Sequence, residues 1–341
     1  MNRHPEPACL DKPLDNSIQP SNLRLGTQRF PCPRPITIMF QEPHSAELFG
    51  EQRDYWWNHD FLDLMAARWR LNEAASLADI GCGLGHWSRL LYPYLRPPAR
   101  LAGIDREPRW IAEAPERFRR AFPLVAPELI TFQQGDATQL PLTDASFDVV
   151  TCQTVLMHLA QPLEALREML RILRPGGLLL CVEPNNFWNY LGHNSLTDAE
   201  PVETLVRQFE FWLRQHRGRL AAGRGNHSVG DLLPGYFAGL GLRDISVYQN
   251  DRPAPLIPPY ASPDQKALVE QESQWKNAAT GPWNQTDLRQ LFLQGGGSES
   301  LFESAFADTV QKYQAEQRAL AEGRFHAAGG TLSYLVSARK T

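Results

Sequence analysis

The sequence predicts an α/β protein built on a doubly wound, mainly parallel sheet. Five short apolar runs alternate with helix-like segments in the middle of the chain, and they occupy residues 76–80, 100–104, 129–133, 147–152 and 178–182. The helix-like segments lie between these runs, near residues 86–95, 108–122 and 162–174. Because strands that alternate with helices form right-handed crossovers, this order favours parallel strands with helices on both faces of one sheet.

The helix-like segments carry their own start and stop signals. The third of them has one apolar face, made by Leu163, Leu166, Leu170 and Leu173. The sequence RPGG at 174–177 predicts its end. Pro115 lies inside the second segment and predicts a kink or a break there, because proline cannot donate the helical hydrogen bond.

The flanking regions predict less regular structure. Eight of the 27 prolines fall in the first 43 residues, so residues 1–43 are expected to form an irregular segment. An apolar face then recurs at every fourth position, at Trp57, Phe61, Met65 and Trp69, which indicates a helix packed on the core. Residues 44–341 are expected to form one domain with helical insertions at about 185–225 and 255–325, and strands near 242–251 and in the final GGTLSYLVSARK.

Composition excludes some functions. A net charge of -4 argues against a protein that binds nucleic acid through bulk positive charge. The first residues resemble no signal peptide, and no run is long and apolar enough to span a membrane, so we expect a cytoplasmic protein. Five cysteines form neither a CxxC pair nor a metal-ligand spacing, which predicts reduced thiols and no metal.

The stretch LADIGCGLGHW, residues 77–87, places three glycines directly after the first apolar run. Gly81, Gly83 and Gly85 follow the order G-x-G-x-G rather than the dinucleotide order G-x-G-x-x-G, and glycine lets a ligand approach the backbone closely. Asp79 would repel a pyrophosphate but suits a ligand that carries an ammonium group. A tight strand-to-helix turn without a ligand is the alternative.

Two further aspartates follow strand-like runs. Asp105 ends LAGID, where a carboxylate can accept both hydroxyls of a ribose or can cap the next helix. Asp136 of QGDATQL follows the third run and can accept a hydrogen bond from the amino group of an adenine, with the backbone N–H of Ala137 beside it. An Asx turn at Asp136 is the other interpretation.

Four motifs in order resemble those of class I S-adenosylmethionine-dependent methyltransferases: LADIGCGLGHW, LAGIDREP, QGDATQLPLTDASFDVVTCQTVLMHL and LRPGGLLLCVEPNN. They cover about residues 76–184 and are most similar to the small-molecule branch that includes the ubiquinone/menaquinone-biosynthesis methyltransferases. The resemblance implies a Rossmann-like sheet of seven strands, the last antiparallel and inserted between the fifth and sixth. It also implies S-adenosyl-L-methionine as cofactor and S-adenosyl-L-homocysteine as product.

Residue roles follow from the same resemblance by position. The three glycines would admit the cofactor's amino-acid part, and Asp79 would help to hold its ammonium. Asp105 would bind the ribose hydroxyls, and Asp136 and Ala137 would contact the adenine. Gln153, after the fourth strand, would line the cofactor.

The expected reaction is methyl transfer to a small-molecule acceptor by in-line displacement, in which positioning supplies much of the acceleration. His158 of TVLMHLAQP either contacts the substrate or acts as a base, unless it is a capping or packing residue, and Glu183 is a second catalytic candidate. Aromatic side chains in RDYWWNHDF and PNNFWNYLGH either enclose an aromatic or apolar acceptor or pack within the insertions. These are Tyr55, Trp56, Phe187, Trp188 and Tyr190.

Other functions are disfavoured by what the motifs contain. The fourth strand is followed by CQTV and not by the Asn/Asp-Pro-Pro-aromatic motif of enzymes that methylate nucleobase amino groups or glutamine amides. A nicotinamide-dependent oxidoreductase would need the dinucleotide spacing of glycines, and a non-catalytic scaffold would be expected to carry degraded motifs. The arginine-rich RQHRGRLAAGR either attracts an anionic acceptor or forms a solvated helix face. The acceptor, the methylated atom and the oligomeric state are left open.

Overall fold

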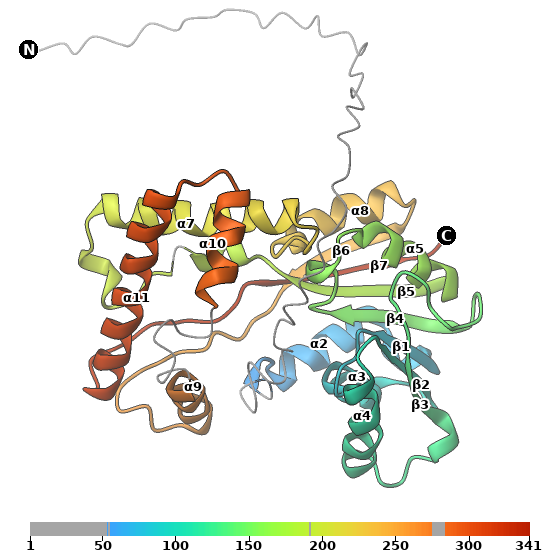
Figure 1. Ribbon diagram of the computed structural model, residues 1–341. Helices are drawn as coiled ribbons and strands as arrows, with labels where there is room; N and C mark the ends of the chain where they lie inside the picture. The colour runs from blue at the N-terminus through green and yellow to red at the C-terminus, as the bar shows by residue number, and fades with distance from the viewer. Residues whose placement is uncertain (1–52, 54, 191, 275–283) are drawn as a thin grey trace, which may run out of the picture. The chain divides into compact units, whose positions relative to one another are not determined.

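Seven strands form one sheet in the computed structural model, which describes residues 53, 55–190, 192–274 and 284–341 (Figure 1). The strands are β1 Ser76–Ile80, β2 Arg100–Asp105, β3 Ile130–Gln134, β4 Phe147–Gln153, β5 Leu173–Pro184, β6 Arg243–Gln249 and β7 Ser333–Arg339. Their order in the sheet is β3-β2-β1-β4-β5-β7-β6. The first five strands are parallel, and β7 pairs antiparallel with both β5 and β6. The predicted fold class and the place of the last strand are confirmed.

Helices flank these strands in the order that the sequence predicts. The helices are α2 His59–Trp69, α3 His86–Leu91, α4 Pro108–Ala121, α5 Pro162–Ile172, α6 Asn186–Tyr190, α7 Val202–Ala221, α8 Leu233–Gly239, α9 Pro263–Gln274, α10 Gln285–Gln294 and α11 Glu299–Ala321. Short 3-10 turns connect several of them, and the turn η5, Leu156–His158, directly follows β4. Helix α5 ends just before RPGG, as predicted.

Successive residues of a strand pack into different core clusters because the sheet is covered on both faces. Leu77 and Leu101 belong to a core cluster that also contains Trp87 and Phe118, from α3 and α4. Ala78, next to Leu77, belongs to a second cluster, which includes the buried face of α5. All five residues of β1 are buried, as expected for the central strand of a doubly wound sheet. Of the face predicted for the first helix, Met65 and Trp69 are buried on α2, as is Trp57 before it.

One helix excludes one of the two outcomes predicted at Pro115. The helix is not broken there, since α4 is a single helix of 14 residues with Pro115 inside it, and the kink stays a prediction. Pro115 is exposed, so the carbonyl of Ile111, which loses its partner to the proline ring, lies on the same outer side of the helix. Water can satisfy that carbonyl, and the buried face around Ala114 and Phe118 continues without interruption.

The two predicted insertions contain helices that pack on one another. Helices α6 and α7 lie within residues 185–225, and α9, α10 and α11 lie within residues 255–325. Phe211 of α7, Phe292 of α10 and Phe302 of α11 form a separate apolar cluster. Gly218 lets α7 and α10 approach closely, because a Cβ there would lie 1.8 Å from the carbonyl oxygen of Leu291. The expected boundary of the domain and the irregular residues 1–43 lie outside the described residues and stay predictions.

The described cysteines are buried thiols. Cys82, Cys152 and Cys181 are free and lie in or next to β1, β4 and β5. Cysteine at such positions packs as a small apolar side chain. Across the described part of the chain, no helix combines the length and apolar character needed to cross a membrane.

Candidate functional site

The predicted binding residues gather at the carboxyl ends of the parallel strands. Asp79 is the last residue but one of β1, Asp105 ends β2 and Gln153 ends β4. The register pairs Asp79 with Gly103 of β2 and with Thr151 of β4. Because β1 lies between β2 and β4, these ends meet at one edge of the sheet, where α/β proteins bind their ligands.

The glycine-rich turn leaves β1 with three successive left-handed glycines. The φ angles of Gly81, Gly83 and Gly85 are 69°, 51° and 72°. The N–H of Gly81 donates to the carbonyl of Ile104 at 2.7 Å, which ties the turn to β2. A Cβ on Gly81 would lie 2.4 Å from Cγ2 of Val155, so this glycine also makes room for the segment after β4. Positive φ and close packing therefore explain the glycines without yet naming a ligand.

Asp105 binds the turn and can still bind a ligand. Its Oδ2 accepts a hydrogen bond from the N–H of Gly83 at 2.8 Å, and its Oδ1 accepts one from the N–H of Glu107 at 2.9 Å. The bond to Glu107 is an Asx turn and not the helix cap that is the alternative role of Asp105, because Glu107 is itself the N-cap residue of α4 and no side chain caps that helix. Each carboxylate oxygen has a further lone pair, so the ribose role of Asp105 stays a prediction.

Asp136 forms an Asx turn, its alternative role. Its Oδ1 accepts from the N–H of Thr138 at 2.7 Å and from the Thr138 hydroxyl at 2.6 Å, and these bonds hold the pKa of Asp136 below its usual value. The Asp136 side chain is exposed, and the half-buried Ala137 packs on the core beside it. The N–H of Gly135 donates to the carbonyl of Asp105 at 3.0 Å, which brings this loop next to the ribose candidate. Adenine contact by Asp136 and Ala137 stays a prediction.

Asp79 is almost completely buried beneath the turn. The hydroxyl of Ser88, on α3, donates to its Oδ2. Burial raises the pKa of Asp79 to about 7, and the charge of Asp105 adds to that effect, whereas the bond from Ser88 and the charge of Arg53 oppose it. Asp79 is therefore poised between its neutral and charged forms near pH 7, and a cationic ligand would favour the charged form.

Two further residues, Arg53 and His86, are buried at this site and are not among the predicted ones. Arg53 is only 9% exposed, and its charge reaches both Asp79 and His86. Burial lowers the pKa of His86 to about 3, with the charges of Arg53 and Arg89 acting in the same direction, so this imidazole is neutral. His86 stands directly after the glycine-rich turn, but no motif points to Arg53, which lies 26 residues before Asp79 in the sequence.

Gln153 places an unsatisfied group in the site. The side chain is buried, and its Oε1 has no hydrogen-bond partner among the described residues. Most buried polar atoms in folded proteins are hydrogen-bonded, so an unpartnered amide oxygen here indicates a place for a ligand donor. The prediction that Gln153 lines a cofactor is consistent with this geometry.

Glu183 holds the turn that carries His158. Its Oε1 accepts from the N–H groups of Val155 and Leu156, both at 2.8 Å, and its Oε2 accepts from that of Met157 at 3.2 Å. Burial raises the pKa of Glu183 to about 7, while these backbone bonds lower it. His158 is exposed at the end of this turn, with its ring 5.9 Å from that of His227. Their catalytic roles stay predictions, and the geometry favours positioning for Glu183.

The aromatic candidates separate into two groups. The ring of Phe187 lies 4.5 Å from that of His216, and the ring of Tyr190 stacks on that of Trp212 at 5.6 Å, so α6 and α7 share an aromatic seam. Burial lowers the pKa of His216 to about 4 and raises that of Tyr190 to about 12. Trp188, by contrast, is 68% exposed.

The other two aromatic candidates lie beside arginines. The guanidinium of Arg252 lies 5.7 Å from the ring centre of Tyr55, and that of Arg53 lies 5.3 Å from the ring centre of Trp56. Of the arginine-rich stretch on α7, Arg214 pairs with Glu210 at 2.6 Å. Such an ion pair is typical of an arginine with a structural role, so the charge of Arg214 does not belong to an unpaired basic patch.

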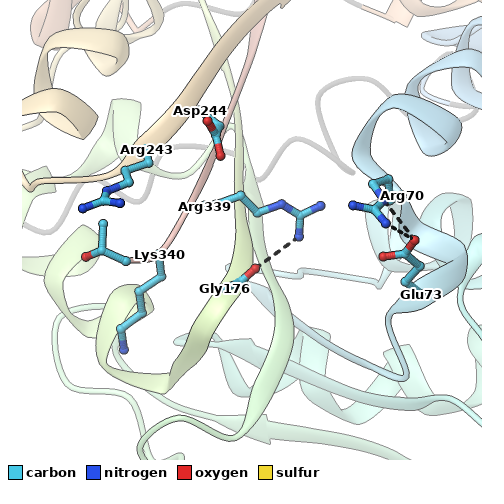
Figure 2. A pocket seen from close by; sticks show the side chains of 8 residues that line it. Arg70, Glu73, Gly176, Arg243, Asp244, Arg339 and Lys340 are labelled. Atoms are coloured by element: carbon cyan, nitrogen blue, oxygen red, sulfur yellow. Dashed lines mark hydrogen bonds and ion pairs between the residues drawn. The ribbon is translucent and has the colours of Figure 1, made fainter.

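A hollow among the described residues lies elsewhere. Its volume is about 440 Å³, and Figure 2 shows the residues that line it, among them Arg70, Gly176 and Arg339. Arg70 precedes β1 and Gly176 lies in the first part of β5, so the hollow is at the amino ends of these strands, whereas the glycine-rich turn follows the carboxyl end of β1. Arg70 pairs there with Glu73, and Arg339 donates to the carbonyl of Trp69 at 2.7 Å. The ammonium of Lys340 donates to main-chain carbonyls at the end of α5. Arg339 and Lys340 thus bind carbonyls at the ends of α2 and α5, and the hollow is remote from the predicted site.

Comparison with known sequences supports the motif resemblance. A family model described as a methyltransferase domain matches residues 78–181. An uncharacterized 37.1 kDa protein in transposon TN4556 of Streptomyces fradiae is 38% identical over 130 residues, which cover 38% of this chain and 34% of that protein. The demethylmenaquinone methyltransferase of Listeria innocua serovar 6a is 32% identical over 127 residues, covering 37% of this chain and 50% of that protein. The match thus spans half or less of these relatives' length.

Solved structures show more distant likenesses. The YcgJ protein from Bacillus subtilis has a TM-score of 0.43 and 19% identity, covering 83% of this chain and 99% of that chain. Phosphoethanolamine N-methyltransferase 2 of Haemonchus contortus, solved with S-adenosyl-L-methionine, has a TM-score of 0.41 and 17% identity, covering 82% of this chain and 52% of that chain. Likenesses of this degree say nothing of the substrate.

Proposed function

Residues 78–181 of this chain belong to the class I S-adenosylmethionine-dependent methyltransferases, and on this premise we propose that the protein methylates a small-molecule acceptor. The methyl group of S-adenosyl-L-methionine is transferred by in-line displacement, and S-adenosyl-L-homocysteine is released. The observation that supports this proposal best is the convergence of Asp79, Asp105 and Gln153 on the glycine-rich turn at one sheet edge.

The residues at this edge fit the cofactor. The turn gives backbone access, since Gly81 and Gly85 carry no Cβ and adopt positive φ. Asp79 matches the ammonium, and Asp105 retains lone pairs for the ribose hydroxyls. The unpartnered Oε1 of Gln153 offers an acceptor for a further donor group. Asp136 and Ala137 lie in the adjacent loop, where the adenine is expected.

S-adenosyl-L-methionine, when bound, supplies an electrophilic methyl group on a sulfonium, so the protein needs no group of its own to activate the methyl. The chain's contribution is to hold an acceptor behind that methyl and to keep water away. Glu183 fixes the turn η5 through three backbone hydrogen bonds. His158 stands at the end of that turn and contacts the acceptor, or takes its proton if the acceptor arrives protonated.

The acceptor site is proposed along the aromatic seam. Phe187 and Tyr190 follow β5 directly on α6, and they pack on His216 and Trp212 of α7. Apolar and ring-bearing acceptors suit such surroundings. Of the remaining candidates, Tyr55 and Trp56 precede α2. Trp188 is exposed and does not take part in the aromatic contacts between α6 and α7 described above.

Two measurements test this function. Calorimetry should show binding of S-adenosyl-L-homocysteine and no comparable binding of NAD; the reverse result would overturn the proposal in favour of an oxidoreductase. Methyl-labelled S-adenosyl-L-methionine, incubated with the protein and a small-molecule extract of the source cells, should label a metabolite detectable by mass spectrometry. Binding without any labelled product would indicate a non-catalytic scaffold.

A further inference from the structure

The hollow at the amino ends of the strands is rich in cationic side chains, and the proposed function does not use it. Its volume of about 440 Å³ is within the range of small-molecule sites. The charged side chains that line it are four cations and two carboxylates: Arg70, Arg243, Arg339, Lys340, Glu73 and Asp244. This excess of positive charge is what an anion site requires.

The sheet itself places two of these arginines side by side. Arg243 of β6 and Arg339 of β7 are register partners in an antiparallel pair of strands. Like charges at directly opposed positions destabilise such a pair. Figure 2 shows the Arg339 side chain extending toward Arg70, which follows α2. Three segments far apart in the sequence therefore bring arginines to the border of one hollow.

The protein itself occupies these three arginines only in part. No hydrogen bond or ion pair of the exposed Arg243 side chain is found among the described residues. Arg70 pairs with Glu73, but these side chains are 65% and 56% exposed, and so exposed a pair contributes little to stability. Arg339 donates to two main-chain carbonyls, yet a guanidinium has five N–H groups. Donors are thus left for a ligand on all three.

The two carboxylates do not fully cancel the repulsion between the cations. Burial lowers the pKa of Arg339, and the charge of Arg70 acts in the same direction, whereas the charges of Glu73 and Asp244 oppose it. A further anion in the hollow would relieve this repulsion, because it favours the charged form of each guanidinium.

We infer that this hollow binds a small molecule that carries a phosphate group, held by Arg70, Arg243 and Arg339. A guanidinium matches a phosphate through paired N–H donors, and the nearly two negative charges of a phosphate group suit several arginines better than the single charge of a carboxylate. Arg70 precedes β1 and the glycine-rich turn follows it, so this site is separate from the proposed cofactor site.

Pyrophosphate is the probe, and citrate, a carboxylate anion of similar charge, is the comparison ligand. Calorimetry on the full chain, at pH 7.5 and at an ionic strength fixed with sodium chloride, should show that pyrophosphate binds at one site and more tightly than citrate. Arg243→Gln and Arg70→Gln should each weaken pyrophosphate binding by about tenfold, because each removes charge-assisted hydrogen bonds.

Two further variants complete the experiment. Glu73→Gln removes the carboxylate that competes for Arg70, so it should tighten pyrophosphate binding severalfold, which a merely structural role of Arg70 does not predict. Arg318→Gln is the matched control, because Arg318 is exposed on α11 and does not line the hollow. It removes the same charge as Arg243→Gln and should leave the affinity unchanged. If Arg70→Gln does not fold, Arg243→Gln and Glu73→Gln decide the question.

Several results would overturn the inference. These are no binding of pyrophosphate by the wild-type protein, equal binding of citrate, unchanged affinity in Arg243→Gln, or an equal loss in Arg318→Gln. Displacement of pyrophosphate by S-adenosyl-L-homocysteine would also overturn it, since the probe would then occupy the glycine-rich turn. A protein that binds pyrophosphate as expected but no S-adenosyl-L-homocysteine would contradict the proposed function alone.

Discussion

At the scale of single residues, Asp79 couples folding to ligand binding. Burial under the turn raises its pKa to about 7, although the Ser88 hydroxyl and the charge of Arg53 both favour the ionised form. At neutral pH, Asp79 is therefore uncharged in a large fraction of the molecules. Binding a cationic group must therefore draw a proton off Asp79, which links affinity to pH.

We expect the affinity for S-adenosyl-L-homocysteine to rise with pH up to about 7 and then to level off. Below that pKa the carboxylate must lose its proton before it can pair with the ammonium, so affinity should fall by about tenfold per pH unit. Calorimetry between pH 5.5 and 8 measures this. Asp79→Asn should bind more weakly at pH 8 and show a flatter profile; an unchanged profile would remove Asp79 from the ammonium site.

Asp105 supports the turn and is expected to bind the ribose. Asp105→Ala should weaken cofactor binding by about 1–3 kcal/mol, because charge-assisted hydrogen bonds are lost. The same change also releases the N–H of Gly83, so the thermal midpoint of the variant should be measured alongside its affinity. Unchanged affinity in a folded variant would refute the ribose assignment.

At the scale of elements, the site depends on how the turn after β1 meets the turn after β4. Gly81 and Val155 pack so closely that a Cβ on the glycine would lie 2.4 Å from the valine side chain. Glu183, from β5, fixes Val155 and the following residues by backbone hydrogen bonds. Contacts from β1, β4 and β5 thus together determine the position of His158.

Gly81→Ala should destabilise the protein more than Gly176→Ala. Both glycines have similar φ angles, 69° and 74°, but a Cβ on Gly176 would meet nothing within 4 Å. The two substitutions therefore cause similar backbone strain. The difference in unfolding free energy between the two variants then reports the clash with Val155, expected at about 1–3 kcal/mol. Urea denaturation measures it, and Val155→Ala should recover part of the loss in the Gly81→Ala background. Equal effects of the two glycine variants would contradict the clash.

At the scale of the whole molecule, buried acids are spread over distant parts of the fold. Asp79 and Glu183 lie at the sheet edge, while Glu272 lies on α9 in the second insertion. Burial raises the pKa of Glu272 to about 7, and the charge of Glu316 on α11 adds to the effect, whereas a hydrogen bond from Gln317 opposes it. The packing of α9 on α11 therefore depends on protonation.

Glu272→Gln should become more stable relative to the wild type as pH rises. A carboxyl group whose folded pKa lies above its unfolded value of about 4 stabilises the fold at low pH, and this contribution is lost as pH rises through about 7. The lowered pKa values of His86 and His216 make stability rise with pH instead, but both histidines are present in the wild type and in the variant, so their effect cancels in the difference. Urea denaturation at pH 5.5 and 8 measures the difference, with the exposed Glu303→Gln on α11 as control. A pH-independent difference would show that Glu272 ionises normally.

Local patterns were sufficient to predict the elements and their order. The alternation of apolar runs and helical faces depends on neighbouring residues, so it predicted five strands, three helices and the position of the glycine-rich turn with small errors at the ends. Asp79 and Asp105 could be found because they stand at or near the ends of strands, whereas Gln153 was predicted from the motif resemblance. Pro115 shows the limit of local rules, since an exposed proline is tolerated inside α4.

The sequence by itself determined the order of strands and helices and the glycine-rich turn, because these depend on short segments with a regular spacing. The class of cofactor came from the resemblance of its motifs to a known family. Only the tertiary structure decided that Asp79 is buried under the turn, that Glu183 accepts hydrogen bonds from the turn after β4, and that α6 and α7 share an aromatic seam. These contacts join segments far apart in the chain. They arise from packing between distant segments, and the local periodicity of the sequence does not reveal which distant segments pack together.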